Sequence, residues 1–119
     1  MKNICTIFLT VFLFIACSLN GIDEDKSIID ETMTVIDVRT EQEYKKGYLK
    51  NAVNIPHGII EEKIAALVPG REEPIIVYCR SGRRSGIAKK VLNEMGYTNV
   101  INAGSYKKLK KNEPERAKK

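Results

Sequence analysis

The sequence predicts an α/β fold in which a central parallel sheet is covered by helices on both faces. Short apolar segments of strand-like composition alternate along the chain with segments whose apolar residues recur at helical spacing. Strands that alternate with helices form parallel sheets whose two faces are both buried. Of the 119 residues, 43% are hydrophobic and 29% are charged, which fits one globular domain.

The first predicted strand covers residues 33–38 (Met-Thr-Val-Ile-Asp-Val). Thr40 and Glu43 then have the spacing of a capping box, which marks the start of a short helix. Gly47 is expected to stop this helix. A second short strand over residues 52–55 ends at the proline that follows it, because proline cannot donate to a strand ladder.

The second half of the chain repeats the alternation. Apolar residues within 59–67 recur at helical spacing, and the Pro-Gly pair that follows ends this predicted helix. A strand over 74–78, a helix over 85–95 and a last strand over 99–101 complete the pattern.

One cysteine stands where parallel sheets bind ligands. Cys79 directly follows the predicted strand 74–78 and precedes a helix, and ligands of such folds bind at the carboxyl ends of strands. Loop amides and the helix dipole favour negative charge there. Arg80, Arg83 and Arg84 add positive potential, and such surroundings lower a cysteine pKa from about 8.5 to between about 3.5 and 7.5. We therefore predict a nucleophilic thiolate.

The first 16 residues have the pattern of an export signal. A basic start precedes an apolar stretch over residues 4–15, which is shorter than the roughly 20 residues that a spanning helix needs. The end of this stretch resembles the lipobox of bacterial lipoproteins, with Phe14 where that family usually has leucine. The resemblance implies a signal peptide over 1–16 and a lipidated tether over 17–26, with the lipid on Cys17. An ordinary cleaved signal peptide or an uncleaved anchor is the alternative.

This arrangement implies a location and sets one cysteine apart. We expect an exported protein anchored by lipid at the bacterial cell envelope, on the periplasmic face or at the outer membrane. Cys5 would leave with the signal peptide and Cys17 would be acylated, so Cys79 has no internal disulfide partner. A lone thiol is either an inert buried side chain or a reactive group, and the cationic, glycine-containing loop favours the reactive interpretation.

Motifs across the chain resemble those of the rhodanese family, specifically the small single-domain thiosulfate sulfurtransferases of the phage-shock type. The resemblance runs from Val35 to about Tyr106. It departs from the family at Tyr48, where histidine is common, and at Ala103, where glycine is common. The motifs that carry it are Ile36-Asp37-Val38-Arg39, Tyr44, the stretch from Gly47 to Pro56, the Cys79 loop, Gly96-Tyr97 and the stretch from Val100 to Gly104.

The resemblance implies a rhodanese-like domain over residues 27–111 and a two-step sulfur transfer. The Cys79 thiolate would take the outer sulfur of thiosulfate or a similar anion, and the persulfide would pass it to a thiol or a cyanide-like acceptor. No cofactor is implied, and a monomer is expected. Donor and persulfide would be held by residues of the loop, namely Arg80, Ser81, Gly82, Arg83, Arg84 and Ser85. We expect Arg84 to point into the loop, and Ser85 to cap the helix with a possible contact to sulfur.

Two other functions remain open. Cysteine-dependent phosphatases and arsenate reductases resemble this loop, but they have five residues between Cys and Arg, whereas Ser85 stands at that place here. The other alternative is a non-catalytic rhodanese-like module that carries sulfur or binds a partner. Turnover of thiosulfate separates it from an enzyme.

Other residues are assigned supporting or solvent-exposed positions. Asp37 and Arg39 are interpreted as a buried pair that fixes the site, because buried charges need partners. His57 is the only histidine and makes no metal site alone. The lysines from 107 onward are interpreted as solvated and lead into a basic tail over 112–119. With few aromatic residues, the net charge of +5 does not indicate nucleic acid binding.

Overall fold

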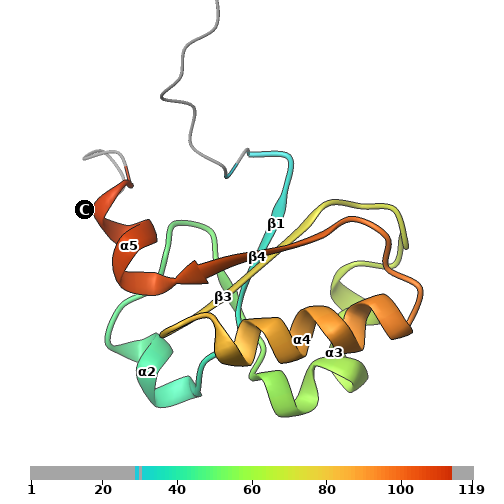
Figure 1. Cartoon of the computed structure of the whole chain (residues 1–119), viewed down its shortest axis with the longest axis horizontal. Helices are drawn as coiled ribbons and strands as arrows, with labels where there is room; N and C mark the ends of the chain where they lie inside the picture. The colour runs from blue at the N-terminus through green and yellow to red at the C-terminus, as the bar shows by residue number, and fades with distance from the viewer. Residues whose placement is uncertain (1–28, 30, 114–119) are drawn as a thin grey trace, which may run out of the picture.

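Four parallel strands form the centre of the structure, a computed structural model that describes residue 29 and residues 31–113 (Figure 1). Their order in the sheet is β2-β1-β3-β4. The α/β class and the parallel sheet are thus confirmed. The strands are β1 (Thr34–Asp37), β2 (Val53–Asn54), β3 (Ile75–Cys79) and β4 (Val100–Ser105).

Helices connect the strands and cover both faces of the sheet. In Figure 1, α3 and α4 lie together on one face, while α2 and α5 supply apolar side chains to the other. None of the described helices has the length and apolar character needed to cross a membrane. The helical segments are α2 (Glu41–Lys45), the 3₁₀ turn η1 (His57–Ile59), α3 (Ile60–Leu67), α4 (Arg83–Glu94) and α5 (Tyr106–Lys111).

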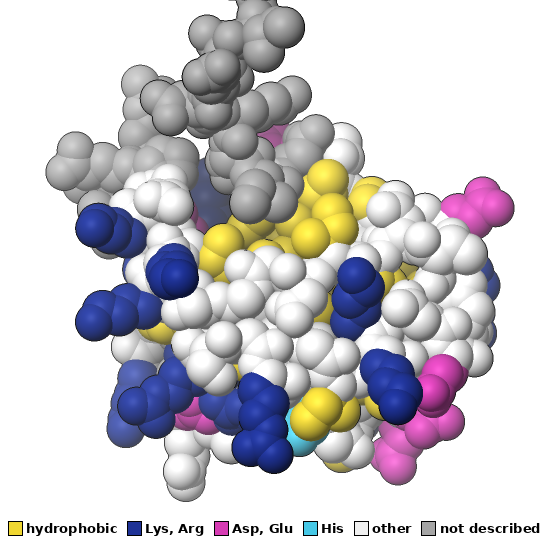
Figure 2. Space-filling view, in the orientation of Figure 1, with side chains coloured by type: hydrophobic (Ala, Val, Ile, Leu, Met, Phe, Trp, Pro, Cys, Tyr) yellow, Lys and Arg dark blue, Asp and Glu magenta, His cyan; other side chains and the backbone are white. Residues whose placement is uncertain are grey.

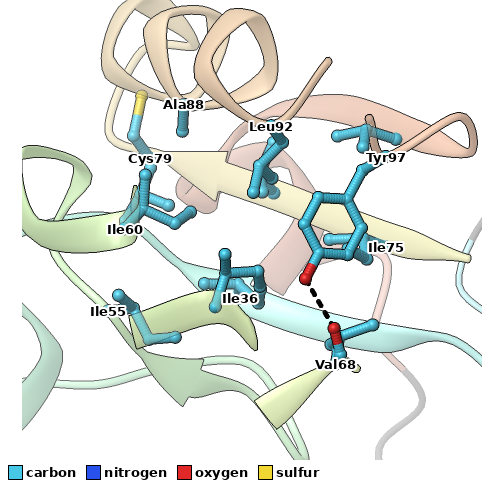
Figure 3. Packing of buried hydrophobic residues seen from close by; sticks show 13 residues of the cluster. Ile36, Ile55, Ile60, Val68, Ile75, Cys79, Ala88, Leu92 and Tyr97 are labelled. Atoms are coloured by element: carbon cyan, nitrogen blue, oxygen red, sulfur yellow. Dashed lines mark hydrogen bonds between the residues drawn. The ribbon is translucent and has the colours of Figure 1, made fainter. Parts of the chain in front are cut away.

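Alternate residues of the central strand β3 pack into two separate cores. Val77 and Cys79 face the larger core beneath α3 and α4, where Leu92 is fully buried (Figure 3). Tyr78 points to the opposite face and joins Val35 in the smaller core. This period of two is that of a strand, and burial on both faces explains why the strand sequence is continuously apolar.

The capping box of α2 is confirmed. The Thr40 side chain accepts the backbone N–H of Glu43 at 3.2 Å, and the Glu43 carboxylate accepts the backbone N–H of Thr40 in return. Helix α5, in contrast, was not predicted. Its residues 107–111 are not a featureless solvated tail, because Tyr106 and Leu109 of this helix pack against the smaller core.

Helix α4 begins two residues earlier than predicted. Gly82 is its N-cap, with φ of 99°, a left-handed conformation that glycine adopts without strain. A Cβ at this position would lie 3.4 Å from the Cα of Gly104. Ser85 therefore lies in the first turn of α4, and the prediction that it caps the helix is wrong.

Several predictions fall on parts of the chain that the structure does not describe. The signal peptide over 1–16, the tether over 17–26 with Cys17, and residues 114–119 of the basic tail lie outside the described residues. They stay predictions.

Candidate active site

Cys79 is the last residue of β3, at the carboxyl edge of the sheet, and its side chain is fully buried. The sulfur points toward α4 (Figure 3). The backbone N–H of Gly82 donates to Sγ at 2.9 Å. The surroundings of the thiol are therefore not purely apolar, as they would be for an inert core cysteine.

Opposing effects act on the acidity of this thiol. Burial alone raises the pKa of Cys79, since it penalises the thiolate. Hydrogen bonds from the Ser85 hydroxyl and from the amides of Ser85, Ser81 and Gly82 outweigh burial, so the pKa is lowered from its ordinary value. Amides that converge on one buried sulfur can hold a thiolate or a persulfide anion, in the way that an oxyanion hole holds oxygen.

Asn102 of β4 belongs to the site, although the sequence did not single it out. Its Nδ2 donates to the carbonyl of Gly82 at 3.1 Å, and its Oδ1 accepts the backbone N–H of Gly104 at 3.0 Å. These two contacts fix the orientation of the amide. Asn102 pairs with Val77 in the regular register of the ladder, and a β-bulge follows it, because Tyr78 pairs with Gly104 and Ala103 is left as an extra residue on β4.

Asn102 also competes with the sulfur for the single hydroxyl proton of Ser85. The Ser85 oxygen lies 2.7 Å from Oδ1 of Asn102, 3.0 Å from the carbonyl of Gly82 and 3.4 Å from Sγ of Cys79. The hydroxyl can rotate, so its one proton can be donated to any one of these three acceptors at a time. The hydroxyl stabilises a thiolate only when it turns toward the sulfur, so the loop amides are the lasting donors.

The three arginines of the loop have different surroundings. Arg84 forms a forked pair with Glu43 of α2, at 2.6 and 3.0 Å, and this pair together with the nearby Cys79 raises the pKa of Arg84. That Arg84 points into the loop stays a prediction. Arg84 lowers the pKa of Glu43 to about 2. Arg80 and Arg83 are exposed, and within the described residues neither forms an ion pair. They are the arginines that can meet an incoming anion.

A buried network supports the site from the end of β1. The predicted pair is present: Arg39 donates to both carboxylate oxygens of Asp37, at 2.6 to 3.1 Å. The Tyr78 hydroxyl donates to the same carboxylate at 2.9 Å and accepts the backbone N–H of Leu49. Arg39 also donates to the carbonyl of Gly47. The carboxyl ends of β1 and β3 are thereby tied together.

In the part of the chain that the structure describes, the candidate metal ligand His57 does not belong to a metal-binding group. His57 begins η1 and is half-buried. Among residues 29 and 31–113, no group of three histidine, cysteine or acidic side chains could hold a metal ion.

Comparison with known families and proteins gives one consistent result. The profile of the Rhodanese-like domain matches residues 21–112. The chain is 46% identical over 74 residues to thiosulfate sulfurtransferase PspE of Escherichia coli, covering 62% of this chain and 71% of that protein. It is 37% identical over 84 residues to a putative thiosulfate sulfurtransferase, mitochondrial, of Schizosaccharomyces pombe, covering 61% of this chain and 59% of that protein.

Solved structures of similar proteins share the fold. An E. coli rhodanese structure with anions superimposes with a TM-score of 0.62 at 45% identity, and the match covers 63% of this chain and 88% of that one. The human single-domain sulfurtransferase TSTD1 superimposes with a TM-score of 0.60 at 26% identity, covering 70% of this chain and 85% of the human one.

Proposed function

This chain belongs to the rhodanese-like domain family, and on that premise we propose that it is a sulfurtransferase that uses Cys79 as its nucleophile. The observation that carries the proposal is the buried sulfur at the end of β3, which accepts the N–H of Gly82 and has a lowered pKa. A sulfur held in this way is a thiolate at neutral pH more often than a free cysteine is.

The proposed reaction has two half-reactions. In the first, the Cys79 thiolate attacks the outer sulfur of thiosulfate, a new S–S bond forms, the bond to the sulfonate sulfur breaks, and sulfite leaves with its electron pair. The persulfide anion then lies against the amides of Ser81 and Gly82. In the second, an acceptor nucleophile takes the outer sulfur and restores the thiolate. Arg80 and Arg83 are the proposed contacts for the donor's oxygens.

The test measures each half-reaction. The wild-type chain mixed with thiosulfate should release sulfite and gain one sulfur atom, located on Cys79 by mass spectrometry. Cys79→Ser should do neither, and its far-ultraviolet circular dichroism should match the wild type. Sulfite release by the variant, or a sulfur adduct elsewhere, would refute the mechanism. An adduct on Cys79 without turnover would instead indicate a sulfur-carrying module.

We also propose that the mature chain begins at a lipidated Cys17 and is held at the bacterial cell envelope. Support comes from the basic start, the short apolar stretch over residues 4–15 and the cysteine that follows it. Acyl chains contribute about 0.8 kcal/mol per buried CH₂, so several chains on one residue anchor a protein firmly. Cys17→Ser should move the protein from the membrane to the soluble fraction. A wild-type chain with an unmodified intact mass would exclude the lipid.

A further inference from the structure

The hydroxyl of Ser85 needs a hydrogen-bond acceptor in every state of the reaction, because this side chain is fully buried. A buried hydroxyl without a partner costs free energy, since it loses the hydrogen bonds that water supplies in the unfolded chain. The Ser85 oxygen lies 3.4 Å from Sγ of Cys79 and 2.7 Å from Oδ1 of Asn102. Two acceptors of different chemistry are thus within reach of a single proton.

The third nearby acceptor, the carbonyl of Gly82, already has two donors. It lies 3.0 Å from the Ser85 oxygen. It accepts the backbone N–H of Gly86 at 3.0 Å and Nδ2 of Asn102 at 3.1 Å, and these two donors use both lone pairs of its oxygen. Oδ1 of Asn102, in contrast, accepts the backbone N–H of Gly104 and keeps one lone pair for Ser85. The Ser85 proton is therefore shared mainly between the sulfur and this oxygen.

The amide of Asn102 cannot be reversed without losing its contacts. A reversed side chain would place Oδ1 against the Gly82 carbonyl and Nδ2 against the N–H of Gly104, so like groups would face each other. The amide also packs against α4, where a Cβ on Gly86 would lie 3.5 Å from Nδ2. The side-chain oxygen of Asn102 is therefore held toward Ser85 by contacts that do not involve the sulfur.

The sulfur changes as an acceptor during sulfur transfer, whereas Asn102 does not. A thiolate carries a full charge, and hydrogen bonds to charged acceptors are roughly twice as strong as neutral ones. In the persulfide the negative charge lies on the outer sulfur, and Sγ becomes a weak acceptor like the sulfur of a thioether. A neutral thiol is a weak acceptor as well. The Ser85 hydroxyl therefore gains most from the sulfur in the thiolate state.

We propose that Asn102 is a positioning residue for sulfur transfer, which accepts the hydrogen bond of the Ser85 hydroxyl whenever Sγ does not carry the negative charge. The inference rests on the proposed sulfurtransferase function. When Cys79 is a thiolate, the hydroxyl turns to the sulfur, and once the persulfide has formed it turns back to Oδ1. The proton stays bonded to the Ser85 oxygen throughout. Asn102 thereby stabilises the thiol and the persulfide relative to the thiolate.

The charged groups near the sulfur are unchanged when Asn102 is replaced, because an amide carries no charge. Figure 2 shows lysine and arginine side chains gathered on the side of the molecule where α2 and α5 lie, and their field acts on Cys79 in every variant alike. A change in the acidity of Cys79 on removal of Asn102 thus reports hydrogen bonding. The charged or titratable groups of the elements around Cys79 are Asp37, Arg39, Glu43, His57, Arg80, Arg83 and Arg84.

The experiment compares Asn102→Leu in two backgrounds, the wild type and Ser85→Ala. Leucine is close to asparagine in size but has no side-chain donor or acceptor. Two quantities are measured on full-length protein. One is the pH midpoint of iodoacetamide alkylation of the peptide that contains Cys79, and the other is the equilibrium constant for loading sulfur from thiosulfate with release of sulfite, at a pH above every alkylation midpoint. Asn99→Leu, which replaces an exposed asparagine just before β4, is the matched control.

In the wild-type background, we expect Asn102→Leu to lower the alkylation midpoint by about 0.3 to 1 pH unit, because the hydroxyl is then free to donate to the thiolate. The loading constant should fall by about 2- to 10-fold, because the persulfide loses the acceptor that the hydroxyl uses. In the Ser85→Ala background both changes should be absent, within about 0.2 pH unit and about 1.5-fold. Asn99→Leu should show neither effect.

Two results in the variants would overturn the inference. Equal shifts in both backgrounds would mean that Asn102 acts on the shape of the loop and not through Ser85. An unchanged or raised midpoint in the wild-type background would mean that the amide does not compete with the sulfur.

A second measurement decides the matter if circular dichroism shows that Asn102→Leu does not fold. In the wild type, the NMR carbon shift of the Asn102 side-chain carbonyl should titrate with the midpoint of Cys79, and it should titrate less in Ser85→Ala. Equal titration in the two proteins would refute the inference. Failure of the wild type to load sulfur would refute the proposed function, whereas the alkylation midpoints would still test the role of Asn102.

Discussion

Replacing Asp37 by asparagine tests the buried network at the end of β1 while changing few atoms. The carboxylate is fully buried and accepts hydrogen bonds from the Arg39 side chain and backbone and from the Tyr78 hydroxyl. Asparagine keeps one acceptor but removes the charge that compensates Arg39. Breaking a buried pair from one side costs about 3 to 5 kcal/mol. We expect about 3 kcal/mol, the lower end of that range, because Arg39 keeps the Gly47 carbonyl and the Tyr106 ring.

Urea unfolding measures this cost directly. With a slope of about 1 to 3 kcal/mol per molar urea, a loss of about 3 kcal/mol lowers the midpoint by about 1 to 3 M. Glu41→Gln is the matched control. The side chains of Lys45 and Glu41 form an ion pair and are 72% and 71% exposed, so this pair is expected to contribute less than about 0.5 kcal/mol. An Asp37→Asn variant within about 1 kcal/mol of the wild type would refute the reasoning.

A double variant isolates the coupling between the two charges. Asp37→Asn/Arg39→Met removes the orphaned guanidinium together with its partner, so it should be less destabilised than the two single changes added together. Strict additivity would mean that the two side chains do not stabilise each other.

Three further predictions concern the site and its supports. Ser85→Ala should raise the pKa of Cys79, seen as an upward shift in the pH dependence of alkylation by iodoacetamide; an unmoved midpoint would contradict the role given to the hydroxyl. Glu43 has a pKa of about 2 beside Arg84, below its unfolded value of about 4.3, so its stabilisation is present at neutral pH and is lost as the pH falls through about 2. Glu43→Gln should therefore lower the urea midpoint at pH 7 but barely at pH 2, and equal losses at both would count against the pair. Tyr97→Phe removes a buried hydroxyl that donates to the backbone carbonyl of Val68 at 2.6 Å. The variant should lose about 1 to 3 kcal/mol of unfolding free energy in urea. An unchanged free energy would mean that water replaces the contact.

The elements that the sequence predicted well are those with a local signal. Strand β3 is an uninterrupted apolar run, and the capping box of α2 lies within four residues of chain. Helix α5 has no such signal, because most of its residues are lysines. It is stabilised by Tyr106 and Leu109, whose partners lie in β1, β3 and the loops after α2.

The site residues show the same distinction between local signals, which the sequence contains, and contacts between distant positions, which it does not reveal. Cys79 and its loop are contiguous in sequence, so their meeting could be predicted from the strand-loop-helix order. The pair of Glu43 and Arg84 joins positions 41 apart, and its acidic member already had a local role as part of the capping box. Asn102 lies beside the loop because β4 pairs with β3, and its hydrogen bond to Gly82 joins positions 20 apart, which no local sequence pattern predicts.

The place of Cys79 on an interior strand has a consequence for motion. β3 has hydrogen-bonded neighbours on both sides, β1 and β4, so its amides should exchange with deuterium only when the sheet opens as a whole. Arg80 and Ser81, one and two residues further on, are exposed and can open locally. The reactive sulfur is thus held by an interior strand, whereas the Arg80 side chain, which we propose contacts the donor, lies on an exposed loop.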